Sequence, residues 1–148
     1  MAGNIDTIII DTSALMSFLM PDEKHSKEIQ NIFDELAVYN VEVIAPQLLL
    51  YEVGNTLKTG ILRKRINKKQ ANFIAERFLE LGIDFYEVEV QKVLNISVKY
   101  DLSFYDASYV YLARKMKADL LSFDGNLMEL SRLWLYIQKK ETRGILQL

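Results

Sequence analysis

The stretch TIIIDTSAL, Thr7–Leu15, decides the fold. Its β-branched run, Thr7–Ile10, is continuously apolar, which is typical of a strand buried on both faces rather than of a strand with one wet face. Asp11 ends the run, and Ser13–Met20 has the length and composition of a short helix that Pro21 stops. A buried strand that passes into a helix through an acid predicts an α/β fold with that acid at the carboxyl end of the strand.

The same alternation continues to the end of the chain. Further strands are predicted at Val41–Pro46, Ile83–Val88, Asp119–Phe123 and Trp134–Gln138, and helices at Glu23–Val38, Gln47–Thr59, Lys68–Leu81, Val90–Tyr100 and Tyr105–Lys117. Strands alternating with helices predict a parallel sheet covered on both faces, with ligands at the carboxyl ends of the strands near the switch in strand order.

The length and composition exclude several classes of protein. At 148 residues the chain is expected to form one domain over residues 1–148. The absence of cysteine excludes disulfide scaffolds, thiolate metal sites and a cysteine nucleophile, and the one histidine, His25, makes a zinc centre or a catalytic triad a poor interpretation. A net charge of −2 is not that of a globally basic nucleic-acid binder. We expect no membrane span and no signal peptide, and therefore a cytoplasmic protein.

Four of the acidic residues stand among apolar neighbours, where acids are rare unless something compensates them. They are Asp11, Glu52, Asp106 and Asp124. Asp11 and Asp124 each end a strand and open a helix, so each also fits a helix cap. Asp106 also fits a helix-dipole role. Glu52 lies mid-helix, where capping is not available and no basic residue lies within one turn.

The fold would bring these four carboxylates together. At about 5 Å and an effective dielectric of 20, each pair repels by about 3 kcal/mol, so the cluster requires a divalent cation or protonation of some acids. Hard oxygen ligands select Mg²⁺ or Mn²⁺ over zinc. The chemistry indicated is metal-assisted attack of water on a phosphodiester.

Four stretches occur together in an order that resembles one family. They are IIIDTSAL at Ile8–Leu15, YEVGNTLKTG at Tyr51–Gly60, LSFYDASYVYLA at Leu102–Ala113 and DLLSFDGNL at Asp119–Leu127. The chain resembles the PIN domain and, within it, the VapC-type toxin ribonucleases of toxin–antitoxin pairs. The resemblance implies a three-layer α/β/α sandwich around a mainly parallel five-stranded sheet of order 3-2-1-4-5.

The resemblance also assigns roles to particular residues. It implies that Asp11, Glu52, Asp106 and Asp124 are the catalytic residues and hold Mg²⁺ or Mn²⁺. Four polar residues are implied as their supports: Ser13, Asn55, Ser122 and Asn126. Ser13 also fits a helix cap, Asn55 is expected to orient Glu52 or a metal-bound water, Ser122 stands where the family usually has threonine, and Asn126 also fits a turn.

A basic stretch follows the helix that carries Glu52. Between Lys58 and Lys69 there are six basic residues and no acid. Such asymmetry indicates a phosphate-binding edge, although a solvated helix junction has the same composition. We predict RNA binding by residues directly after this helix, beside the cleft: Arg63, Lys64, Arg65, Lys68 and Lys69.

The leading interpretation is a metal-dependent endoribonuclease with an RNA substrate, a possible cognate antitoxin and a homodimeric state. The homodimer is expected to pair through the aromatic helix Tyr105–Lys117 and Trp134. One alternative is a catalytically silent PIN-fold binding module. A more remote one is an aspartate-dependent phosphatase or receiver-like domain, which is disfavoured because a phosphatase needs a second aspartate where Ser13 stands.

Overall fold

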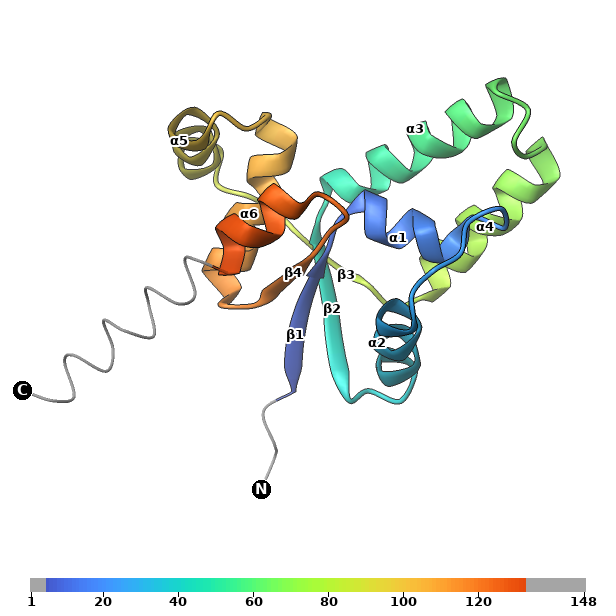
Figure 1. Ribbon diagram of the computed structural model, residues 1–148, viewed down its shortest axis with the longest axis horizontal. Coiled ribbons are helices and arrows are strands. Elements are labelled where there is room, and N and C mark those ends of the chain that lie inside the picture. The colour runs from blue at the N-terminus through green and yellow to red at the C-terminus, as the bar shows by residue number, and fades with distance from the viewer. Residues whose placement is uncertain (1–4, 133–148) are drawn as a thin grey trace, which may run out of the picture.

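A computed structural model describes residues 5–132 of the chain. Four parallel strands form one sheet in the order β3-β2-β1-β4 (Figure 1). Their bounds are β1 Asp6–Ile10, β2 Val41–Pro46, β3 Asp84–Tyr86 and β4 Asp119–Leu121. The parallel α/β architecture and the strand order 3-2-1-4 that the sequence predicts are thereby confirmed.

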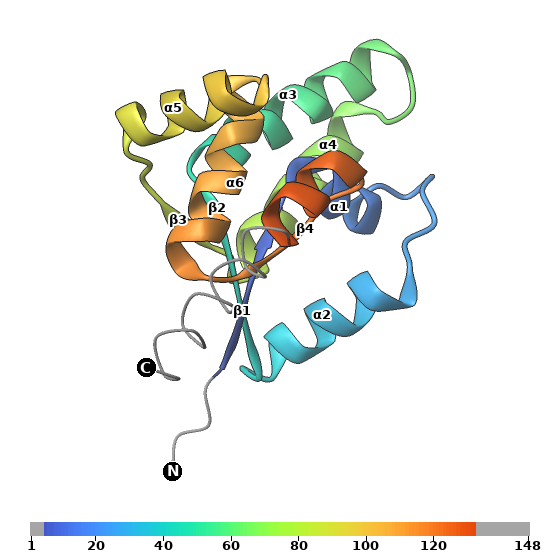
Figure 2. The ribbon, with the colours of Figure 1, turned by 60° about the vertical axis from the view of Figure 1, so that its left-hand side comes forward.

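Helices connect the strands and cover both faces of the sheet. Their bounds are α1 Thr12–Leu19, α2 Lys27–Ala37, α3 Leu48–Leu62, α4 Lys68–Glu80, α5 Val90–Tyr100 and α6 Phe104–Met116. Residues 125–132 are also helical. The helices α1 to α4 pack on one side of the sheet and α5 and α6 on the other, so the molecule has three layers (Figures 1 and 2).

Successive residues of the central strands point into different cores, as the pleat of a strand requires. Ile10 belongs to the core under α1 to α4, whereas Ile9 belongs to the core under α5 and α6. In the neighbouring strands Val43 and Ile44 divide between the two cores in the same way. This two-sided burial explains why β1 ends in an uninterrupted apolar run, Ile8–Ile10, with no polar alternation.

The switch in strand order falls between β1 and β4. The chain moves from β1 outward to β2 and β3, and then returns to the other side of β1 with β4. The register pairs Ile10 with Leu121, and the backbone N–H of Asp11 donates to the carbonyl of Leu121 at 3.1 Å. The residues that follow β1 and β4 therefore meet at the carboxyl edge, where such sheets place ligands.

Some elements differ from their predicted bounds. The predicted helix Glu23–Val38 begins only at Lys27, because the side chain of Ser26 caps it by accepting from the N–H of Ile29. The helix α3 was expected to end near Gly60 but runs to Leu62. A Cβ at Gly60 would lie 3.2 Å from Ile66, so this glycine permits close packing instead of stopping the helix.

The predicted number of strands is corrected. The sheet has four strands within residues 5–132, not five, and the predicted fifth, Trp134–Gln138, lies outside the described residues. Just after α4, Gly82 has a φ of 79°, a left-handed backbone conformation that glycine adopts without steric cost at the end of a helix. None of the helices in the described part of the chain has the length and apolarity needed to cross a bilayer.

Candidate active site

Asp11 is the most constrained acid of the candidate site. It is only 7% exposed, and it caps α1 by accepting from the N–H of Ala14 at 3.0 Å. The same oxygen, Oδ1, accepts from the Ser13 hydroxyl at 2.7 Å, and Oδ2 accepts from the Ser122 hydroxyl. Three donors on one buried carboxylate compensate its desolvation, so the capping and functional interpretations of Asp11 are compatible.

The two serines join the loops that follow β1 and β4. Ser13 Oγ accepts from the N–H of Phe123 at 3.0 Å, and Ser122 Oγ accepts from the N–H of Asp124 at 2.9 Å. Each hydroxyl thus donates to Asp11 and accepts from the backbone after β4. Ser13 and Ser122 therefore hold Asp11 and also fix the backbone that presents Asp124.

Asp106 and Asp124 face the same edge. Asp106 lies in the first turn of α6, whose cap Ser103 accepts from its N–H at 3.0 Å. Partial burial raises the pKa of Asp106; the Ser103 hydrogen bond lowers it, and the negative charges of Asp124 and Asp11 raise it again. The two charges that act on Asp106 belong to the residues that follow β1 and β4. Asp124 Oδ1 also caps the following helix, accepting from the N–H of Asn126 at 3.0 Å.

Glu52 is held by a buried tyrosine of α6. The hydroxyl of Tyr109 donates to Glu52 Oε1 at 2.6 Å and also lies 3.2 Å from the Thr12 hydroxyl. Burial, and secondly the bond to Glu52, raise the pKa of Tyr109, so it remains a protonated donor. This chain from Glu52 through Tyr109 to Thr12 connects α3 to the residue beside Asp11.

Two predicted supporting residues have other positions. Asn55 is exposed on α3, and the side chain that orients Glu52 is Tyr109 rather than Asn55. Asn126 lies in the first turn of a helix, not in a turn, and its backbone N–H is what contacts Asp124. The sequence analysis does not assign roles to Tyr109 and Thr12. The one pattern that indicates such a role is the position of Tyr109 three residues after Asp106 on the same helix.

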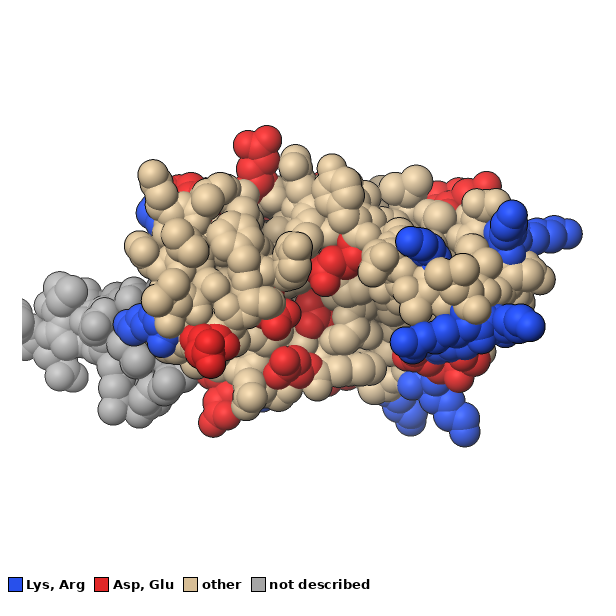
Figure 3. Space-filling view, turned by 90° about the horizontal axis from the view of Figure 1, so that it is seen from above, with Lys and Arg blue, Asp and Glu red and all other residues tan. Residues whose placement is uncertain are grey.

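Acidic side chains gather around the middle of the carboxyl edge, which faces the viewer in Figure 3. Carboxylate and hydroxyl oxygens are suitable donors for Mg²⁺. Within residues 5–132, however, no three acidic or histidine side chains enclose a metal position by themselves. A hydrated Mg²⁺ needs only one or two carboxylates together with substrate phosphates, and Asp11, Asp106 and Asp124 are oxygen donors of that kind. That all four acids hold the ion together stays a prediction.

The basic residues lie apart from these acids. Most of them project at the right-hand end of the face in Figure 3, where α3 and α4 meet. At 1.5 Å per residue, Arg63 is roughly 16 Å from Glu52 along α3, so the stretch does not lie beside the cleft as expected. Arg65 contacts Asp22 at 2.9 and 3.0 Å and Glu23 at 3.2 Å, and these acids compensate its charge.

With this geometry established, comparison with known proteins assigns the class. The PIN domain family model matches residues 8–133. The chain belongs to the PIN domain family, as the sequence resemblance indicates.

Two proteins named as ribonucleases are similar to the chain over most of their length. The chain is 25% identical over 126 residues to Ribonuclease VapC3 of Pyrobaculum aerophilum, covering 82% of this chain and 92% of that protein. It is 26% identical over 124 residues to Ribonuclease VapC1 of Mycobacterium tuberculosis, covering 83% and 90%.

Solved structures show the same fold. The crystal structure of PAE2754 from Pyrobaculum aerophilum has a TM-score of 0.69 at 20% identity, covering 86% of each chain. Mycobacterium tuberculosis VapC20, described as a toxin that cleaves the sarcin–ricin loop, has a TM-score of 0.55 at 18% identity, covering 81% of this chain and 92% of that one.

Replacing Ser122 with alanine tests the support of Asp11. We expect Ser122→Ala to lower the free energy of unfolding by about 1–3 kcal/mol, because it removes a donor from a buried carboxylate. Ser17→Ala is the matched control, since Ser17 is equally buried but donates only to the carbonyl of Ala14 in its own helix. Equal urea-unfolding curves for the two variants would contradict this role of Ser122.

Proposed function

We propose that this PIN domain is a VapC-type endoribonuclease that requires Mg²⁺ or Mn²⁺ and hydrolyses phosphodiester bonds of RNA. The observation that carries the proposal is the buried carboxylate of Asp11 at the switch point, which three donors hold in place, with Asp124 in the loop after the neighbouring strand and Glu52 held by Tyr109. Two relatives that match over most of their length are named ribonuclease VapC, which supports the same reaction.

Each side chain has a defined part in this reaction. A bound Mg²⁺ supplies an activated water and neutralises charge on the scissile phosphate. Asp11 holds its oxygens at a fixed position because three donors orient it. Asp106 and Asp124 complete the negative edge, and Glu52 keeps one orientation while Tyr109 donates to it. Water replaces the 3′ oxygen at phosphorus, which leaves a 5′-phosphate and a 3′-hydroxyl.

A catalytically silent binding module is the second candidate. All four acids are present, and burial raises the pKa of Asp106, with the negative charges of Asp124 and Asp11 raising it further. A fold kept only for protein contacts would not need this repulsion, so the enzyme is favoured. Metal-dependent cleavage of RNA separates the two candidates.

Replacing Asp11 with asparagine tests the enzyme. Asn caps a helix about as well as Asp, so Asp11→Asn is expected to fold, while the lost charge reduces RNA cleavage below detection and weakens the stabilisation by Mg²⁺. The measurements are cleavage of labelled RNA and thermal unfolding with and without Mg²⁺.

The matched control for this variant is Asp84→Asn, at the exposed start of β3, the strand two places away from β1 in the sheet. It is expected to retain both cleavage and the response to Mg²⁺. Cleavage by the Asp11 variant at the normal rate, or cleavage by the unaltered protein in excess chelator, would contradict the proposal.

The proposed RNA path runs from the acidic edge along α3 to the basic stretch. An acidic edge repels phosphate, so part of the binding energy has to come from cations further along the strand. Arg63, Lys64, Lys68 and Lys69 are exposed there, whereas Arg65 is already paired with Asp22 and Glu23. We therefore expect Arg65 to contribute least to RNA binding.

A salt titration tests this path. The double change Arg63→Ala and Lys64→Ala is expected to lower the log–log salt slope of RNA binding by about 1.4, at about 0.7 per lost phosphate contact. The control Arg65→Ala is expected to change the slope less than Arg63→Ala alone or Lys64→Ala alone. Binding is measured on the Asp11→Asn background, which prevents cleavage. An unaltered slope in the double variant would show that RNA takes another path.

The proposed homodimer needs a surface other than the predicted one. Tyr109 and Tyr111 of the aromatic helix are buried at 2% and 5% exposure, and Trp134 lies outside the described residues. The helix α5 instead exposes an apolar row at helical spacing: Val90, Leu94 and Val98. We assign the pairing of two copies to this row.

As in VapC-type pairs generally, a protein antitoxin is the other proposed partner.

Charge placed on the row tests the dimer. Leu94→Glu is expected to weaken self-association by at least about tenfold, because a carboxylate would be buried without a partner. Asn95→Glu adds the same charge to α5 outside the row and is expected to leave association unchanged. Sedimentation equilibrium gives the dissociation constants. A monomer at tens of micromolar for the unaltered protein would refute the pairing.

A further inference from the structure

A pocket of about 320 Å³ opens at the carboxyl edge beside the acids. It is bounded by the junction of β2 with α3, the residues after β3 and the first turns of α6. Its lining includes Gln47, Tyr86, Glu87, Phe104, Tyr105 and Ser108. Because β2 and β3 are parallel to β1, their ends bring this pocket to the same edge as Asp11.

The pocket and the candidate active site share two helices. Leu48 lines the pocket and lies one turn before Glu52 on α3, a spacing that puts two Cβ atoms about 5–6 Å apart. On α6, the pocket residues Tyr105 and Ser108 lie on either side of Asp106 in sequence. A nucleotide whose phosphate meets the acids can therefore reach the pocket with its own base or with a neighbouring one.

The chemistry of the lining selects a base rather than a phosphate. Three aromatic rings line the pocket, and that of Tyr105 is 60% exposed and so available for stacking. No Lys, Arg or His occurs among the described lining residues, and Glu87 adds a carboxylate. This charge repels phosphate but accepts a hydrogen bond from the exocyclic amino group of adenine, cytosine or guanine, which uracil lacks.

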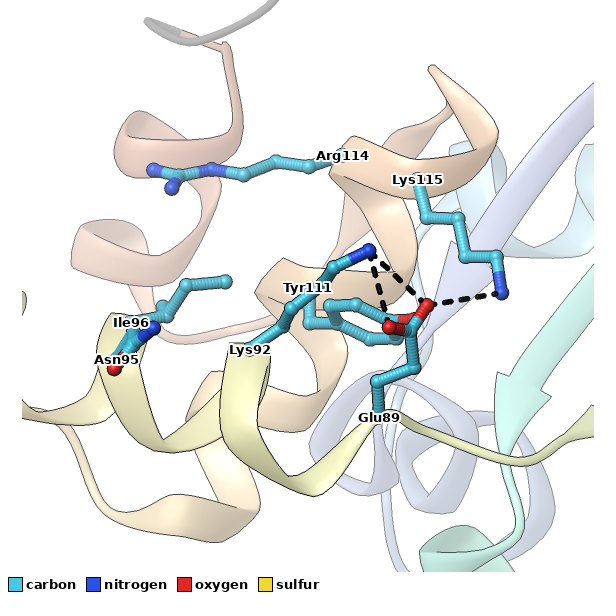
Figure 4. Close-up of a pocket in the computed structure, with 7 residues that line it drawn as sticks. All are labelled: Glu89, Lys92, Asn95, Ile96, Tyr111, Arg114 and Lys115. Atoms are coloured by element: carbon cyan, nitrogen blue, oxygen red, sulfur yellow. Dashed lines mark hydrogen bonds and ion pairs between the residues drawn. The ribbon is translucent and has the colours of Figure 1, made fainter.

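The larger pocket in Figure 4 lacks a lining of this kind, which is aromatic and free of cations. It lies between α5 and the last two turns of α6, and its one carboxylate, that of Glu89, is already paired with three of the other lining side chains. Glu89 accepts from Tyr111 at 3.0 Å, and its carboxylate lies 3.0 Å from Lys92 and 3.9 Å from Lys115. These contacts tie α5 to α6, so an incoming group would have to displace them.

We propose that the pocket lined by Tyr86, Phe104 and Tyr105 seats one nucleobase of the RNA beside the cleaved bond and prefers bases with an exocyclic amino group. The proposal rests on the ribonuclease function and makes this pocket its specificity subsite. Stacking on Tyr105 supplies the affinity, and Glu87 supplies the discrimination against uracil.

The binding test uses trinucleotides that carry the fluorescent base 2-aminopurine at one position, with the Asp11→Asn protein in Mg²⁺. Stacking is expected to quench the fluorescence at one position only, and Tyr105→Ala is expected to abolish the quenching and weaken binding about tenfold. Tyr51→Ala is the matched control, because Tyr51 also precedes an acid, Glu52, and is 77% exposed, but does not line the pocket.

The cleavage test uses RNAs that differ in one base beside the cut. The protein is expected to prefer amino-bearing bases over uracil in kcat/KM, and Glu87→Gln is expected to reduce this preference, because an amide both donates and accepts. Quenching at no position, or equal effects of Tyr105→Ala and Tyr51→Ala, would overturn the pocket proposal even if RNA is cleaved. Quenching that depends on Tyr105 without any cleavage would uphold the base site and refute the ribonuclease.

Discussion

The carboxylate of Asp11 is the group on which the rest of the site depends. It is buried at the point where β1 ends, and there it caps α1 and accepts from two serine hydroxyls. Those hydroxyls in turn accept from the backbone after β4. One buried charge thus fixes the start of a helix and the relative position of two loops, and desolvation would make it costly if any of these donors were absent.

Around this carboxylate, the edge divides into regions with different chemistry. Asp11 and Asp124 follow the two strands at the switch point, the aromatic pocket lies at the ends of β2 and β3, and Arg63 lies roughly 16 Å from Glu52 along α3. Under the proposed function, an RNA would have to extend along α3 to contact both the acids and Arg63. The separation keeps the cations from neutralising the acids directly.

Local sequence patterns were sufficient for most of the secondary structure. The bounds of β2 and α5 agree with their predicted ranges, because a proline ends one and a strong apolar spacing defines the other. Errors occurred where a cap or a packing contact sets the boundary. The helix α2 starts at the Ser26 cap, and α3 passes through Gly60 because that glycine packs against Ile66.

The sequence by itself determined the alternation of strands and helices and the position of Asp11 and Asp124 after two strands, because both follow from apolar periodicity and from residue types at strand ends. Only the tertiary structure decided that Tyr109 holds Glu52, 57 residues away, and that Arg65 is paired with Asp22, 43 residues away. It also decided that the exposed apolar row is on α5 and not on α6. These contacts depend on how helices pack across the sheet, and the period of a single helix shows which of its residues share a face but not which neighbour that face meets.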